Sequence, residues 1–106
     1  MPNRDKTSLD YFDLSCSFFE DTKVQFVSAR FGLKGEAILV RLLSRIYGYG
    51  FFYRFGKDER TLFAKWDNIR PAELKFLDDV LDESLKRGFF DAAIFKQFEV
   101  LTSRGI

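Results

Sequence analysis

The chain has 106 residues, 46% of them hydrophobic and 18% aromatic, which is enough for one domain with a substantial core and too few for two ordinary domains. Seventeen Lys and Arg oppose sixteen Asp and Glu, and the resulting net charge of +1 argues against a uniformly basic nucleic-acid coat and against a disordered acidic tail. The absence of His and the single Cys exclude an intrachain disulfide, a Cys/His zinc site and a His general base.

Residues 1–8 are polar, and we expect them to form a flexible lead-in to one domain over residues 9–106. They lack the apolar segment of a signal peptide, and no stretch of the chain is apolar enough to span a bilayer. A cytoplasmic protein without membrane association is therefore expected. Residues 9–17 read as an extended segment.

The first predicted helix begins at Asp21 or Thr22, because either side chain can accept a free N–H of the first turn. It ends at Gly32. A second helix is predicted from Gly35 to Tyr47, and its apolar residues fill most of its circumference, so it should be the most buried helix.

The second half of the chain alternates short aromatic runs with helical patterns. Residues 51–55 are predicted to form a strand, and a third helix should bury Leu62, Phe63 and Trp66 on one face. A fourth helix is predicted from Pro71, with a leucine stripe and a stop at Gly88. Residues 89–90 and 99–101 read as strands, separated by a loop or turn of helix over residues 92–98.

This order of elements predicts a mainly α fold with a small β-sheet, in the α+β class. Two helices joined by a short turn and followed by a hairpin are typical of a winged helix-turn-helix.

Several strings of residues resemble the Lin-type N-terminal domain family of phage and mobile-element proteins. The strings are Leu9-Asp10-Tyr11-Phe12, Phe18-Phe19-Glu20-Asp21, Ser28-Ala29-Arg30-Phe31-Gly32-Leu33-Lys34-Gly35-Glu36-Ala37, Leu62-Phe63-Ala64-Lys65, Leu85-Lys86-Arg87-Gly88-Phe89-Phe90-Asp91 and Leu101-Thr102-Ser103-Arg104-Gly105-Ile106. The family is similar to the winged-helix N-terminal domain of DnaD-like replication initiators and phage replisome organisers. The resemblance implies a winged-helix fold, a phage or bacterial origin, a role near DNA replication and a longer protein of which this is the N-terminal part. It implies no catalytic motif.

The charges are unevenly distributed along the sequence. Residues 22–50 carry five bases against one acid and residues 51–70 carry five against three, whereas residues 71–99 carry four bases against seven acids. In a winged helix the helix from Pro71 would enter the major groove, but its acidic middle would be repelled by phosphates. The candidate phosphate contacts are therefore Lys34, Arg41, Arg45, Lys65, Arg70 and Lys75. An ordinary solvated helix face is the competing interpretation of these residues.

Two further clusters admit two interpretations each. The carboxylates of Asp78, Asp79, Asp82 and Glu83 have helical spacing, but without further ligands they are read as solvated charge and no metal is expected. The aromatic run is most simply core, and its outward side, assigned to Phe51, Tyr53 and Phe55, is a candidate interaction surface or a platform for single-stranded bases.

Two functions therefore compete at the level of sequence. The first is a DNA-associated winged-helix domain of a phage or mobile-element replication protein, binding mainly through phosphates without sequence specificity. The second is a protein-interaction or self-association module that does not contact DNA. No enzymatic activity, cofactor or small-molecule substrate is expected.

Overall fold

The longest helix of the computed structural model, α1 (Thr22–Gly48), is bent at Gly32 into two arms. The structure describes residues 11–102, and the predictions for residues 1–10 and 103–106 lie outside that range. The backbone of Gly32 has φ 68° and ψ −159°, a conformation that glycine adopts without a steric penalty. The predicted break between two helices is thus confirmed, and the second arm begins directly after Gly32.

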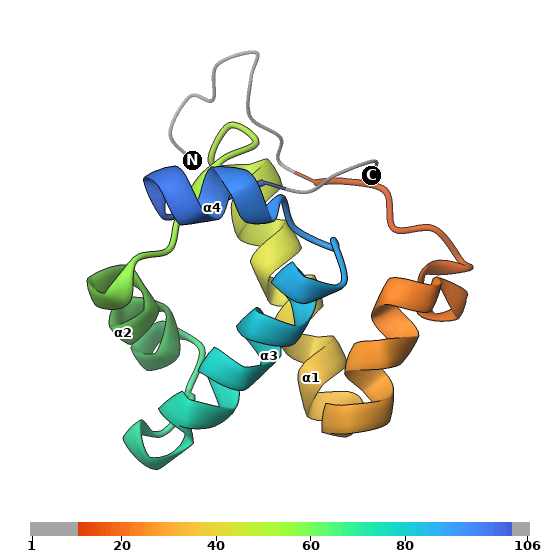
Figure 1. Ribbon diagram of the computed structural model, residues 1–106, viewed down its shortest axis with the longest axis horizontal. Coiled ribbons are helices and arrows are strands. Elements are labelled where there is room, and N and C mark those ends of the chain that lie inside the picture. The colour runs from red at the N-terminus through yellow and green to blue at the C-terminus, as the bar shows by residue number, and fades with distance from the viewer. Residues whose placement is uncertain (1–10, 103–106) are drawn as a thin grey trace.

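The two arms of α1 fold back against each other (Figure 1). Gly35 is buried where the two arms meet. A larger residue would not fit there, because an added Cβ atom would lie 2.6 Å from the Cβ atom of Phe31. The Ser28 hydroxyl donates a hydrogen bond to the Glu36 carboxylate across the bend. At the start of the helix, the Asp21 side chain accepts from the Lys23 N–H at 2.8 Å, which confirms Asp21 as the cap.

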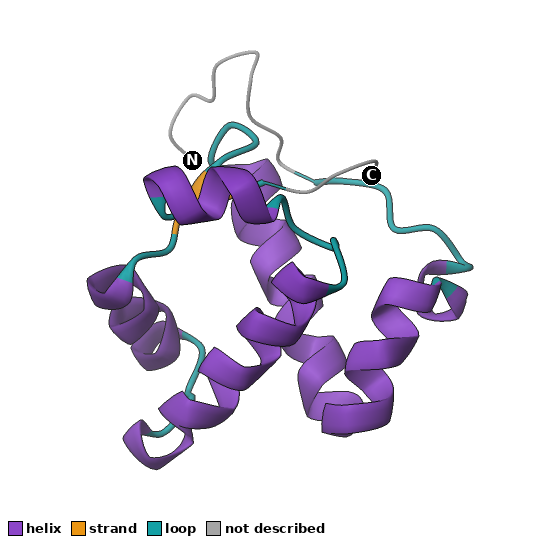
Figure 2. Ribbon diagram, in the orientation of Figure 1, coloured by secondary structure: helices purple, strands orange, loops and turns teal. Residues whose placement is uncertain are grey.

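The remaining elements are short. A 3-10 turn, η1 (Phe18–Glu20), precedes α1, and α2 (Lys57–Trp66), η2 (Pro71–Glu73) and α3 (Leu74–Lys86) follow it. Strands β1 (Tyr53–Arg54) and β2 (Val100–Leu101) pair antiparallel, with Tyr53 opposite Leu101 and Arg54 opposite Val100. Figure 2 shows how small this sheet is beside the helices. The expected class, mainly α with a small β-sheet, is confirmed.

The structure corrects one prediction for the region after α3 and decides between the alternatives of another. The predicted strand at residues 89–90 is reduced to a single bridge residue, Phe90, because this segment turns its side chains into the core. Residues 92–98, expected as a loop or a turn of helix, form helix α4 (Ala92–Phe98), so the helical alternative is confirmed. Asp91 caps this helix by accepting from the Ile94 N–H at 3.0 Å. The stop at Gly88 is confirmed, with φ 81°.

The core lies between the second arm of α1, the inner face of α3 and the aromatic residues of the sheet region. As expected, the second arm of α1 is deeply buried. The fully buried large side chains include Leu39, Leu42, Leu43, Ile46, Phe55, Phe63, Leu77, Leu81, Phe90 and Leu101. Among residues 11–102, no helix is both long and apolar enough to cross a membrane.

Candidate functional site

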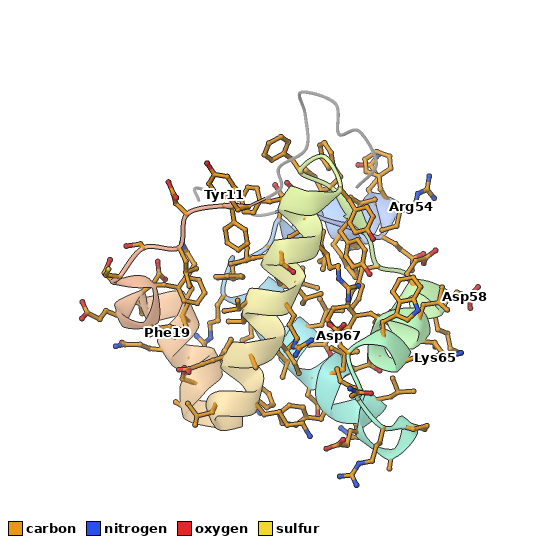
Figure 3. All side chains as sticks on the ribbon, turned by 180° about the vertical axis from the view of Figure 1, so that it is seen from behind. Tyr11, Phe19, Arg54, Asp58, Lys65 and Asp67 are labelled. Atoms are coloured by element: carbon orange, nitrogen blue, oxygen red, sulfur yellow. The ribbon has the colours of Figure 1, made fainter. Side chains whose placement is uncertain are left out.

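The three predicted contacts on α1, Lys34, Arg41 and Arg45, lie on one face, but each of them pairs with an acid from the segment between α2 and α3. Lys34 pairs with Glu73, and Arg45 donates to Asp67 at 2.5 Å. Arg41 lies 3.6 Å from the second oxygen of the same Asp67. Figure 3 shows Asp67 in the interior between α1 and α2. These three cations therefore fasten the α2–α3 connection to α1.

Arg45 is the most enclosed of the predicted DNA contacts. Its side chain is 19% exposed, and its guanidinium lies within 6 Å of the rings of Tyr53, Phe63 and Trp66. It also donates to the Tyr53 hydroxyl at 3.2 Å. Burial raises the pKa of Tyr53, and the hydrogen bond from Arg45 opposes that shift. Arg45 is thus a structural residue rather than an open phosphate ligand.

Three other predicted contacts are open to solvent near the start of α3. Arg70 and Lys75 are 81% and 85% exposed, and each pairs only within its own helical turn, with Glu73 at 3.3 Å and Asp79 at 3.1 Å. Lys65 is exposed on α2, where Figure 3 shows it pointing outward. Exposed pairs of this kind contribute little energy, so their cations can turn to another anion.

The acidic face of α3 is solvated except at Glu83. Asp82 is exposed, and Asp78 is half exposed while it accepts from Arg60 at 3.0 Å. The Glu83 carboxylate is buried and accepts from Arg87 at 2.7 Å and from Arg30 at 2.9 Å. The hydrogen bond from Arg87 lowers the pKa of Glu83. Sequence reasoning grouped Glu83 with the solvated acids because its partner in the first arm of α1 is distant in the chain.

The assignment of Phe51, Tyr53 and Phe55 to an outward surface is wrong for Phe55, whereas Phe51 is exposed and Tyr53 is partly exposed. Phe55 is fully buried, Tyr53 is partly buried and packs against the core, and Phe51 is 37% exposed. The outward side of this segment carries Phe52 and Arg54. The physical reason is that Phe55 and Phe63 meet edge to face, with 5.4 Å between ring centroids, and this pairing fixes which side of the strand faces inward.

The outward side of β1 and the outer face of α2 together form an open groove of about 340 Å³. Its lining is mostly apolar and consists of Tyr49, Phe52, Tyr53, Arg54, Glu59, Leu62 and Trp66. Phe52 is 56% exposed and Trp66 is 59% exposed. The sequence placed Leu62 and Trp66 on the buried face of α2, but Phe63 and Ala64 occupy that face. The surplus of apolar residues on this short helix was the signal that one side of it would stay exposed.

Comparison with known proteins adds a family to this geometry. The family model described as Lin1244/Lin1753-like, N-terminal, matches residues 11–106. The chain belongs to this family. It is 35% identical over 101 residues to an uncharacterized phage-related protein Lin1244/Lin1753 of Listeria innocua serovar 6a, an alignment that covers 95% of this chain. The Lin1244/Lin1753-like chain spans about a third (32%) of the length of that relative. No solved structure matches it.

Proposed function

We propose that this Lin1244/Lin1753-like domain is a non-catalytic winged helix-turn-helix module that attaches a phage-related replication protein to DNA in the cytoplasm. The order of elements supports the winged arrangement: the second arm of α1, β1, α2 and α3 are followed by Phe90 and by β2, which returns to pair with β1. The similarity to DnaD-like initiators is part of this proposal.

The exposure of Arg70 and Lys75 carries the DNA proposal. Both side chains are more than four-fifths exposed, and they flank the N-terminal end of α3, the part of a winged helix that approaches the duplex. Lys65 adds a third cation nearby. Farther along α3, Asp78 and Asp82 would face the phosphates and oppose deep insertion. Binding through the backbone, without base readout, follows from this distribution.

Fluorescence anisotropy with a labelled duplex tests the proposal. Because phosphate contacts weaken with salt, binding is expected at about 50 mM salt and should fall steeply by about 200 mM. The double variant Arg70→Glu/Lys75→Glu should bind at least about tenfold more weakly, since two phosphate contacts become repulsive. The double variant Lys86→Glu/Lys96→Glu is the matched control, because it makes the same change of charge at two exposed residues, one in the last turn of α3 and one on α4 (Figure 1).

Two results would contradict the DNA proposal. The first is a wild-type chain that does not bind duplex at low salt. The second is an equal loss of affinity in Arg70→Glu/Lys75→Glu and in Lys86→Glu/Lys96→Glu, which would show that only the overall charge matters.

The aromatic groove favours a second candidate function, a protein-interaction or self-association module. Exposed aromatic side chains that cluster in one groove are typical of protein interfaces. A photo-crosslinking amino acid at position 66 tests this function in the cell, since a groove that contacts another protein chain gives a covalent adduct. Absence of any protein adduct would contradict it.

A further inference from the structure

The groove between β1 and α2 carries charges as well as aromatic rings. Arg54 lines it from β1, forms no ion pair within residues 11–102, and points away from the domain in Figure 3. Glu59 lines it from α2. The fold thus places a cation and an anion in one apolar groove without pairing them to each other.

A second carboxylate joins Glu59 at Gly56. A Cβ atom added to Gly56 would lie 2.9 Å from Oε1 of Glu59 and 3.1 Å from Oε1 of Glu99, so both carboxylates converge on this glycine. Within the described part of the chain, neither carboxylate forms an ion pair. This concentration of negative charge would be relieved by a cation from another molecule.

We propose that the groove is the contact surface for a second copy of this chain, packed groove to groove about a twofold axis. In such an interface the same patch occurs on both sides, so Arg54 of each copy meets the Glu59 and Glu99 carboxylates of the other. The rings of Phe52 and Trp66 fill the centre and lose their solvent exposure. This inference rests on the second candidate function, and it is independent of DNA attachment at α3.

The charges favour a second copy over a single-stranded nucleic acid. The groove lining carries one cation, Arg54, and one anion, Glu59, and the Glu99 carboxylate lies beside Glu59, so the groove is not a positive surface. Stacking of bases on aromatic rings in nucleic-acid sites is accompanied by a positive groove that follows the backbone. A self-complementary mixture of both signs instead fits an isologous protein contact.

Trp66 provides a direct readout, because it is the only tryptophan of the chain and lines the groove. Sedimentation velocity from low micromolar to millimolar concentration should show a monomer converting to a dimer. The emission of Trp66 should shift to shorter wavelengths over the same range, as the indole leaves water. A chain that stays monomeric throughout, with unchanged emission, overturns the proposal.

Charge reversal tests the predicted pairing. Arg54→Glu should raise the dimer dissociation constant by about tenfold or more, because it faces two carboxylates across the axis. The double variant Arg54→Glu/Glu59→Arg should recover part of the affinity, since the contact between positions 54 and 59 is attractive again while the Glu99 carboxylate still repels. Failure of this rescue, with both variants folded by circular dichroism, overturns the twofold arrangement.

Removal of an aromatic ring tests the apolar centre. Phe52→Ser should abolish the dimer, whereas Leu33→Ser, at an 83% exposed apolar side chain on α1, should leave it intact. A dimer that survives Phe52→Ser places the interface elsewhere. Quenching of Trp66 by oligothymidylate in a monomeric chain would assign the groove to single-stranded nucleic acid and overturn the second copy.

The crosslinking amino acid at position 66 separates this inference from the broader interaction function. A covalent product of twice the chain mass supports the second copy. A product that contains a different protein overturns the second copy and leaves the interaction function standing. No protein product overturns both.

Discussion

The guanidinium of Arg45 donates a 2.5 Å hydrogen bond to the carboxylate of Asp67, which joins the second arm of α1 to the residue that ends α2. The Asp67 side chain is 4% exposed, so the pair is largely withdrawn from water. Arg45 also touches three aromatic rings. Arg45, which the sequence predicted to contact phosphate, therefore holds the α2–α3 connection against α1.

Loss of this buried pair should destabilise the domain. Arg45→Ala or Asp67→Asn is expected to lower the free energy of unfolding by about 3 kcal/mol, because each leaves one charged group without its partner. Arg41→Ala is the control and should cost less than about 1 kcal/mol, since Arg41 is 56% exposed and lies 3.6 Å from Asp67. Urea denaturation measures all three, and equal losses for Arg41 and Arg45 would argue against this account.

Stability should fall in acid through Glu83. The pKa of this carboxyl is lowered in the folded chain, chiefly by the hydrogen bond from Arg87, so the folded state favours the ionised form. The resulting stabilisation is present above the unfolded pKa of about 4.3 and is lost as pH falls through the folded value. Glu83→Gln should be less stable at neutral pH and should lose less stability below about pH 4.3. Parallel pH profiles of the two proteins would refute this if both fell equally.

The bend of α1 should depend on two glycines for different reasons. Gly32→Ala places a side chain at φ 68°, with nothing within 4 Å of the new Cβ, and should cost about 1–3 kcal/mol from backbone strain alone. Gly35→Ala forces its Cβ against Phe31 and should cost a similar amount, about 1–3 kcal/mol, by overpacking. Because the 2.6 Å clash is with the Phe31 Cβ atom, which alanine would keep, only Phe31→Gly removes it. Phe31→Gly should therefore reduce the effect of Gly35→Ala and leave that of Gly32→Ala unchanged. Additive effects in both double-mutant cycles would contradict this distinction.

The register of the β1 segment can be tested with neighbouring phenylalanines. Phe55→Ala removes a fully buried ring and should cost about 3–5 kcal/mol in unfolding free energy. Phe52→Ala removes a ring that is 56% exposed and should change stability by less than about 1 kcal/mol. Thermal and urea unfolding of the two variants would refute the observed register if the costs were reversed.

Local signals predicted much of the helical framework. The Asp21 cap, the break at Gly32 and the stop at Gly88 each follow from the conformational preference of one residue, and each is confirmed. The leucine stripe of α3 also faces inward, with Leu77 and Leu81 fully buried. Such features depend on residues within one or two helical turns along the chain, so they can be predicted from the sequence.

The site was less predictable because it depends on distant neighbours. Periodicity placed Trp66 on an apolar face of α2, but it could not tell whether Phe63 or Trp66 would meet the core first. Periodicity also could not show that Lys34 and Arg45 form ion pairs, because their acidic partners lie in the segment after α2. Helical spacing shows which cations share a face, but it does not show whether another segment already neutralises them.

The pairing of β1 with β2 has a consequence for the order of folding. The two arms of α1 meet through residues close together in sequence, whereas Tyr53 and Leu101 come from opposite sides of α2, α3 and α4. Closing the longer loop costs more chain entropy, so we expect the sheet to form late. Pulse-labelling hydrogen exchange should then protect the amides of α1 before the Phe55 amide, which donates to the Glu99 carbonyl at 2.9 Å. Protection of the Phe55 amide ahead of α1 would reverse this order and would show that the sheet forms before the helix.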